Sequence, residues 1–206
     1  MSGPQGCLDG GSHPHGSGAG WGRMDRMGVY TLGELTTVPV LDRLDLLAPP
    51  TAAALQDSAW ASRVGVVPID PTVSDTDATR STYGLEPETL ANCVVVAGRR
   101  DGQERIAACM VLATTRADIN GTVRRLLDVR KASFLSMDRA VETTGMEYGG
   151  ITPVGLPQSW PILVDQAVAD SPAVIIGSGV RRSKLILPGA LLGQLPGAQI
   201  VPGLGR

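Results

Sequence analysis

Two apolar runs joined by a short polar turn constrain the fold of this chain most strongly. Residues 91–97 are almost continuously apolar, and residues 106–113 repeat that character after the turn 98–103, which contains Asp101-Gly102. An Asp-Gly pair between two such runs is typical of a β-hairpin. A near-continuous apolar run predicts a strand that is buried on both faces. The sequence therefore predicts a central, buried hairpin.

The remaining segments predict single helices mixed with further strands. Strands are expected over residues 64–69 and 173–176, and a turn at 177–179 then leads to the run 183–187. Helices are expected over 40–47 and 51–60, from a cap at Ser74 or Asp75 to Gly84, after Asp118, from Ser136 to Gly145 with Met137 facing inward, and over 189–193. This mixture predicts an α+β fold with a mixed, curved, barrel-like sheet and surrounding helices.

Length and composition predict one domain with a disordered tail. The chain has 206 residues, enough for one domain with a substantial core. Residues 1–30 are rich in glycine and lack an apolar period, which predicts disorder. Residues 31–206 then form a single domain, within which residues 31–62 are expected to be a helical N-terminal extension. No stretch is apolar enough to predict a membrane span.

Charge and cysteine content narrow the class of partner and the compartment. The net charge is −2 and aromatics are only 3% of the residues, which argues against DNA binding and against a broad base-stacking platform. Neither value excludes contact with one end of a nucleic-acid strand. Cys7, Cys93 and Cys109 are isolated, which favours reduced thiols in a cytoplasmic protein. The last two lie in apolar runs and are expected in the core.

The segment that most strongly indicates a functional site is the loop Tyr148-Gly149-Gly150-Ile151-Thr152-Pro153-Val154-Gly155. Glycine permits close approach of another group to the backbone, and Pro153 stiffens the loop. Such a loop can direct N–H groups at a carbonyl or an oxyanion. The best candidate donors are therefore Gly149, Gly150 and Ile151. The Thr152 hydroxyl could contact a water or a substrate amine.

Side-chain catalysts are scarce in the body of the chain. The histidines, His13 and His15, both lie in the glycine-rich tail, so we expect no histidine base, no metal site and no cofactor. A side-chain base would have to be a carboxylate such as Asp165. A structural role for Asp165 is the simpler interpretation.

The order of motifs around the loop resembles the YbaK and prolyl-tRNA deacylase family. Its Gly-x-x-x-Pro loop matches Gly149 through Pro153, and the following glycine matches Gly155. Its two-apolar-then-Asp run matches Leu163-Val164-Asp165, and its glycine turn matches Ser178-Gly179. The resemblance covers roughly the C-terminal two-thirds of the chain. It implies an α+β domain that hydrolyses amino acids from wrongly charged tRNA, with Pro153, Gly155, Asp165, Ser178 and Gly179 around the substrate.

The same resemblance implies two departures from the family pattern. Asn92 stands where the family has a lysine, which replaces a positive charge by two amide donors. Lys131 or Lys184 could substitute for that lysine, although surface charge is the simpler interpretation of both. A second family carboxylate is replaced by a stretch that contains Arg182. The resemblance also implies that a ribose hydroxyl of the tRNA, or a water held by the backbone, acts in place of a side-chain base.

Basic residues after residue 90 are the candidates for tRNA contact. If the fold gathers them around the loop, they form a rim that attracts phosphate; these residues are Arg130, Lys131, Arg181, Arg182 and Lys184. The expected partners are the acceptor end of a mischarged tRNA and an aminoacyl-tRNA synthetase. The alternatives are a catalytically silent module that binds this tRNA end, and a small-molecule hydrolase or amino-acid sensor on the same scaffold.

Overall fold

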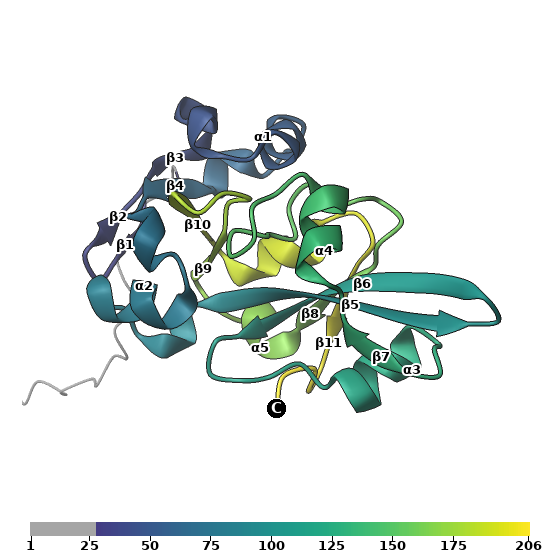
Figure 1. The fold of residues 1–206 in the computed structure, drawn as a ribbon. Coiled ribbons are helices and arrows are strands. Elements are labelled where there is room, and N and C mark those ends of the chain that lie inside the picture. Colours follow the sequence, from purple (N-terminus) through teal and green to yellow (C-terminus); the bar gives the residue numbers. More distant parts are fainter. Residues whose placement is uncertain (1–27) are drawn as a thin grey trace, which may run out of the picture.

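The computed structural model describes residues 28–206 (Figure 1). Most of the predicted disordered tail, with its two histidines and Cys7, lies outside these residues. The described chain has an α+β fold, as predicted, and is built on two main sheets.

The first sheet is organised by the predicted hairpin. Strands β5 (Ala91–Arg100) and β6 (Gln103–Leu112) pair antiparallel over ten residues each. Asp101 and Gly102 close the hairpin with φ values of 51° and 80°, the positive pair that a two-residue hairpin turn requires. Strand β7 (Ala132–Phe134) pairs with β5, and β8 (Ile162–Asp165) and β11 (Ala198–Val201) continue the sheet in parallel beyond β6.

The second sheet is antiparallel and contains four strands in the order β3 (Val38–Pro39), β4 (Gly65–Pro68), β10 (Ser183–Leu187) and β9 (Val174–Gly177). An isolated bridge between Leu90 and Ile175 joins β9 to the entrance of β5. The two sheets are therefore contiguous at this point, although the described strands do not close into a barrel. Strands β1 (Thr31–Leu32) and β2 (Leu35–Thr36) form a separate ribbon.

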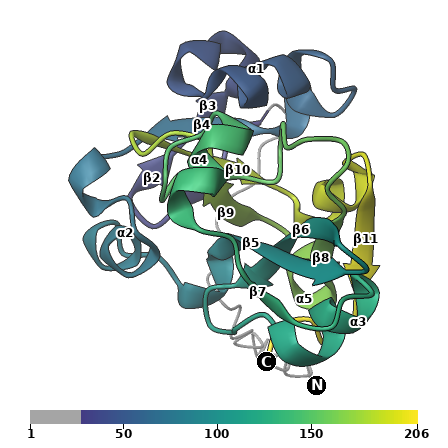
Figure 2. The same ribbon diagram turned by 45° about the vertical axis from the view of Figure 1, so that its right-hand side comes forward.

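Short helices surround the sheets (Figures 1 and 2). They are α1 (Pro49–Gln56), α2 (Thr76–Thr82), α3 (Arg124–Leu126), α4 (Met137–Thr144) and α5 (Gln166–Ala169). Asp75 caps α2 by accepting from the amide of Ala78, and Gly145 ends α4 in the left-handed conformation. No helix among residues 28–206 combines the length and apolarity that a bilayer span needs.

The structure differs from the predicted elements mainly near the N-terminus. Residues 40–47 form two 3-10 turns, not one helix, and short strands precede them. Proline begins α1 two residues before the predicted cap Thr51, because proline fits the first turn of a helix. The final helix is a 3-10 segment, Gly189–Gln194. Met137 was expected to face inward and is 51% exposed, because it lies at the mouth of a cavity.

Candidate functional site

A cavity of about 530 Å³ opens where the two sheets meet. One wall of the cavity is formed by residues 90–95, which comprise the entrance of β5 and its first half. This wall runs from the bridge to β9 at one end to the pairing with β7 at the other. At about 3.3 Å per residue this wall is roughly 16 Å long. The start of α2, the glycine loop, α4 and strands β9 and β10 complete the wall. The volume of the cavity lies within the usual range for small-molecule sites, about 300–1,000 Å³.

The glycine loop is clamped by the Ser178-Gly179 turn between β9 and β10. The Glu147 amide donates to the Gly179 carbonyl at 2.8 Å, and the Gly179 amide donates to the Gly150 carbonyl at 2.7 Å. The Glu147 carboxylate accepts from the Arg181 amide at 2.6 Å. Two segments that lie about thirty residues apart are thus fastened by reciprocal backbone bonds.

Glycine is required where the loop meets its neighbours. A Cβ atom on Gly150 would come within 2.6 Å of the Val180 backbone, and one on Gly155 would collide with the Pro50 carbonyl of α1. The Thr51 hydroxyl of α1 donates to the Val154 carbonyl at 3.2 Å. The loop is therefore braced on one side by the β9–β10 turn and on the other by α1.

The predicted donors of the loop are not equivalent. The Gly150 amide donates to the Glu147 carbonyl at 2.9 Å and is consumed by the loop itself. The Gly149 and Ile151 amides have no acceptor within residues 28–206, and both residues line the cavity. Gly149 adopts φ of +83°, which glycine takes without strain. Two unpaired main-chain donors therefore border the cavity.

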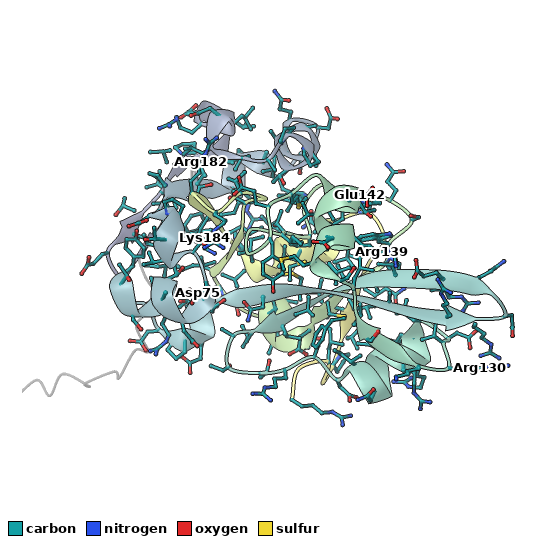
Figure 3. The ribbon with its side chains drawn as sticks, in the orientation of Figure 1. Asp75, Arg130, Arg139, Glu142, Arg182 and Lys184 are labelled. Atoms are coloured by element: carbon teal, nitrogen blue, oxygen red, sulfur yellow. The ribbon has the colours of Figure 1, made fainter. Side chains whose placement is uncertain are left out.

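Lys184 contributes a buried positive charge to the same cavity. Its side chain extends from β10, is only 8% exposed, and donates to the Ser74 carbonyl at 2.8 Å. Burial, and secondarily the Arg181 charge, lower the pKa of Lys184 from 10.5 to about 8, while Asp75 opposes the shift. Figure 3 shows Lys184 and Asp75 in the same part of the molecule. The interpretation of Lys184 as a surface charge is wrong, because all five residues of β10 are buried.

The polar residues around Lys184 were not predicted as site residues, apart from Arg181. Ser74, predicted only as a possible helix cap, is 1% exposed and its hydroxyl has no partner within the described chain. Arg181 reaches over the loop, with its guanidinium donating to the Pro71 carbonyl at 3.0 Å. All of these residues line the cavity. A buried hydroxyl without a partner is costly, which makes Ser74 a ready contact for a bound ligand.

Asn92 lies in the cavity wall beside α2. Its side-chain oxygen accepts from the Thr76 hydroxyl at 2.6 Å, which holds the amide in place and leaves its two N–H groups for another acceptor. Cys93 follows in the same wall. Burial raises the pKa of the Cys93 thiol, so the thiol is protonated at neutral pH and is a poor nucleophile.

Several predicted site residues do not line the cavity. Thr152 is fully buried, and its hydroxyl has no partner among residues 28–206. Pro153 is also buried. Ser178 bonds to the Val180 and Ser183 carbonyls. Asp165 lies at the end of β8 and accepts from the Leu204 amide at 3.2 Å, which fastens the C-terminal segment.

The predicted basic residues separate into three locations. Arg181 and Lys184 line the cavity. Arg182 points away and donates to the Asp45 carbonyl at 2.7 Å. Arg130 and Lys131 line a neighbouring furrow of about 450 Å³ beside β7, and Figure 3 places Arg130 far from Lys184.

Comparison with protein families identifies the family of this fold. A profile of the aminoacyl-tRNA editing domain matches residues 70–194, which is more than half of the chain. The protein belongs to the aminoacyl-tRNA editing domain family. The resemblance to YbaK and prolyl-tRNA deacylases is thereby confirmed. The matched range contains α2, the hairpin, the glycine loop and the β9–β10 turn.

Solved structures share the fold at low sequence identity. A candidate trans-editing enzyme for prolyl-tRNA synthetase superposes with a TM-score of 0.65 at 23% identity, covering 78% of this chain and 99% of that protein. A scaffold protein from computational epitope grafting gives 0.65 at 22%, covering 77% and 97%. The hypothetical protein APE2540 gives 0.60 at 19%, covering 68% and 90%. At these identities the likeness establishes a common fold.

Proposed function

We propose that this protein is a trans-editing deacylase that hydrolyses the ester of mischarged tRNA in the cytoplasm. One observation carries the proposal: the amides of Gly149 and Ile151, which have no acceptor within residues 28–206, border the same cavity as the buried ammonium group of Lys184. Ester hydrolysis builds negative charge on the carbonyl oxygen, and fixed donors in a partly dry site stabilise that charge. Its substrates are mischarged tRNAs, and an aminoacyl-tRNA synthetase is the expected source of them.

Each residue has a separate task in this proposal. Water adds to the ester carbonyl, the bond to the ribose oxygen breaks, and that oxygen takes up a proton from the attacking water. The Gly149 and Ile151 amides receive the oxyanion, and Lys184 supplies the positive charge that Asn92 cannot. Asn92, held by Thr76, donates to the substrate through its amide group.

Activation of the water does not fall to histidine or cysteine in this scheme. Residues 28–206 contain no histidine, and the Cys93 thiol is protonated. As the family resemblance implies, the ribose hydroxyl beside the ester, or a water held by the backbone, takes this role. Lys184 lies where it can favour the charged intermediate without abstracting a proton.

The test is the loss of amino acid from a panel of mischarged tRNAs. The protein is expected to release at least one small amino acid, alanine, serine, cysteine or proline, faster than buffer does. Gly149→Ala keeps the amide N–H but places a side chain at a φ of +83°, which strains the loop and displaces that donor. We expect the rate to fall about 100-fold, as it does when an oxyanion donor is lost.

Gly102→Ala is the matched control, because Gly102 has nearly the same φ, +80°, with open space around it at the far end of the hairpin. It should lose a similar amount of stability and keep the rate. An inactive wild-type protein across the whole panel would favour the alternative, a module that binds this tRNA end without hydrolysis.

A further inference from the structure

The exposed aromatic side chains of the described chain gather at one place. Phe134 is the sole phenylalanine of the protein and leaves 65% of its side chain exposed; Tyr148 leaves 57% exposed. Both line the cavity between the two sheets, which is the catalytic cavity of the proposed function, together with the half-exposed Met137. The other aromatic residues from 28 to 206 are buried or partly buried. Two large aromatic surfaces held in water at the mouth of one cavity indicate a ligand with a flat face.

Phe134 lies where two hollows meet. Phe134 and its neighbour Leu135 line both the catalytic cavity and the furrow beside β7. Phe134 pairs with Val96 and is thereby fixed in the sheet. It lies at the opposite end of the cavity wall from the bridge to β9. A chain that enters along the furrow therefore passes Phe134 before it reaches the cavity.

The furrow carries an excess of positive charge. Its charged lining consists of one carboxylate, Glu104, against Arg99, Arg130, Lys131 and Arg139. Glu104 is engaged by Arg139 at 2.6 Å and by Arg99 at 4.0 Å. Arg130 approaches Asp101 only at 3.9 Å, and Lys131 forms no ion pair with any residue from 28 to 206. Lys131 is thus available to a polyanion, and Arg130 is held only by a long ion pair between two exposed side chains.

We propose that Phe134 is the stacking platform for the terminal base of a single-stranded RNA end, whose phosphates lie in the furrow of Arg130 and Lys131. The inference rests on the proposed function, because it places the ester of that terminal nucleotide in the cavity. Cationic grooves interleaved with aromatic faces bind single strands, since every base offers a π-face. The chain's low aromatic content does not oppose this, because a terminal base needs one platform.

The test measures binding of uncharged tRNA, by fluorescence anisotropy, with and without its terminal adenosine. Phe134→Ala is expected to weaken binding of the intact tRNA about tenfold, which corresponds to the loss of one base–aromatic stack. It should leave binding of the shortened tRNA unchanged. Phe134→Tyr should restore affinity to within about twofold of wild type. Leu41→Ala removes another exposed apolar side chain, outside both hollows, and should change neither affinity.

Salt dependence separates stacking from phosphate contact. Lys131→Gln is expected to reduce the slope of log affinity against log salt by about 0.7, the value for one phosphate of a single strand. Phe134→Ala should leave the slope as it is in the wild-type protein. An unchanged slope in Lys131→Gln would overturn the furrow as the phosphate track.

Four results would overturn the stacking role: intact affinity in Phe134→Ala, an equal loss for both RNAs, no binding of either RNA by the wild-type protein, or self-association that depends on Phe134 in sedimentation. Because uncharged tRNA undergoes no hydrolysis, binding and deacylation fail independently. An inactive panel with Phe134-dependent binding would contradict the proposed enzyme and leave the platform standing.

Discussion

Lys184 is the residue whose environment departs most from its ordinary one. A lysine that is 8% exposed, with one hydrogen bond to the Ser74 carbonyl and an arginine nearby, pays a large desolvation cost in its charged form. The folded state lowers its pKa to about 8. Buried charge held at such a cost is common at functional sites.

Lys184→Met is therefore expected to stabilise the protein. A shift of the lysine pKa from 10.5 to about 8 corresponds to roughly 3 kcal/mol, reduced to about 2 kcal/mol when the hydrogen bond to Ser74 is lost. The folded pKa lies below the unfolded one, so the cost to the wild type is complete below pH 8 and fades as the pH rises to 10.5.

Urea denaturation of both proteins at several pH values checks this. The advantage of Lys184→Met should be full at pH 7 and should narrow above pH 8. A Lys184→Met variant that is less stable than the wild type at pH 7 would show that the buried charge of Lys184 does not destabilise the folded protein.

The burial of Lys184 shows where sequence reasoning stops at the residue scale. The run Ser183 to Leu187 was placed after the Ser178-Gly179 turn, and β10 occupies those residues. One strand cannot reveal what covers its two faces; β10 lies between β4 and β9, and the start of α2 covers the lysine. The one available signal was a lysine inside an apolar strand.

At the scale of elements, the glycine loop and the β9–β10 turn act as one unit. The predicted loop is formed. The sequence did not indicate that the Gly150 amide would be consumed while the amides of Gly149 and Ile151 find no acceptor among residues 28–206. That division depends on backbone bonds to residues 178–180, far along the chain. The role of Asp165 likewise depends on the distant Leu204 amide.

Gly150→Ala tests this unit. The added Cβ would meet the Val180 backbone, which cannot move without opening the clamp, so we expect a loss of about 3 kcal/mol in unfolding free energy together with loss of deacylation. Gly84→Ala, at a positive φ with open space, should cost about 1 kcal/mol and keep activity. Thermal unfolding and rate measurements on both variants decide it. Equal, mild effects would mean that the clamp tolerates a side chain.

At the scale of the whole molecule, the α+β class and the central hairpin were predictable because they follow from local patterns. The Asp-Gly turn sets the register of β5 and β6. Helix α2 begins after its cap Asp75 and helix α4 ends at Gly145, both as the sequence indicated. The short strands near the N-terminus were not predictable, since two-residue strands carry no period. The cavity was not predictable either, because widely separated segments build its wall.

Segments outside the range matched by the family profile also support the site. Helix α1 braces the loop through Thr51 and Pro50. Strand β4, which is itself paired with β3, flanks the strand that carries Lys184. The working unit is therefore larger than residues 70–194. Deacylation should accordingly be measured on the full chain.

The most direct test of the central claim is the single-turnover rate of ester hydrolysis by Lys184→Met, with enzyme saturating over mischarged tRNA. Lysine removal should lower the rate about 100-fold, while the affinity for uncharged tRNA stays at the wild-type value and the fold becomes more stable. A rate equal to that of the wild-type protein would contradict the claim that a buried ammonium group and two main-chain amides together stabilise the reacting ester.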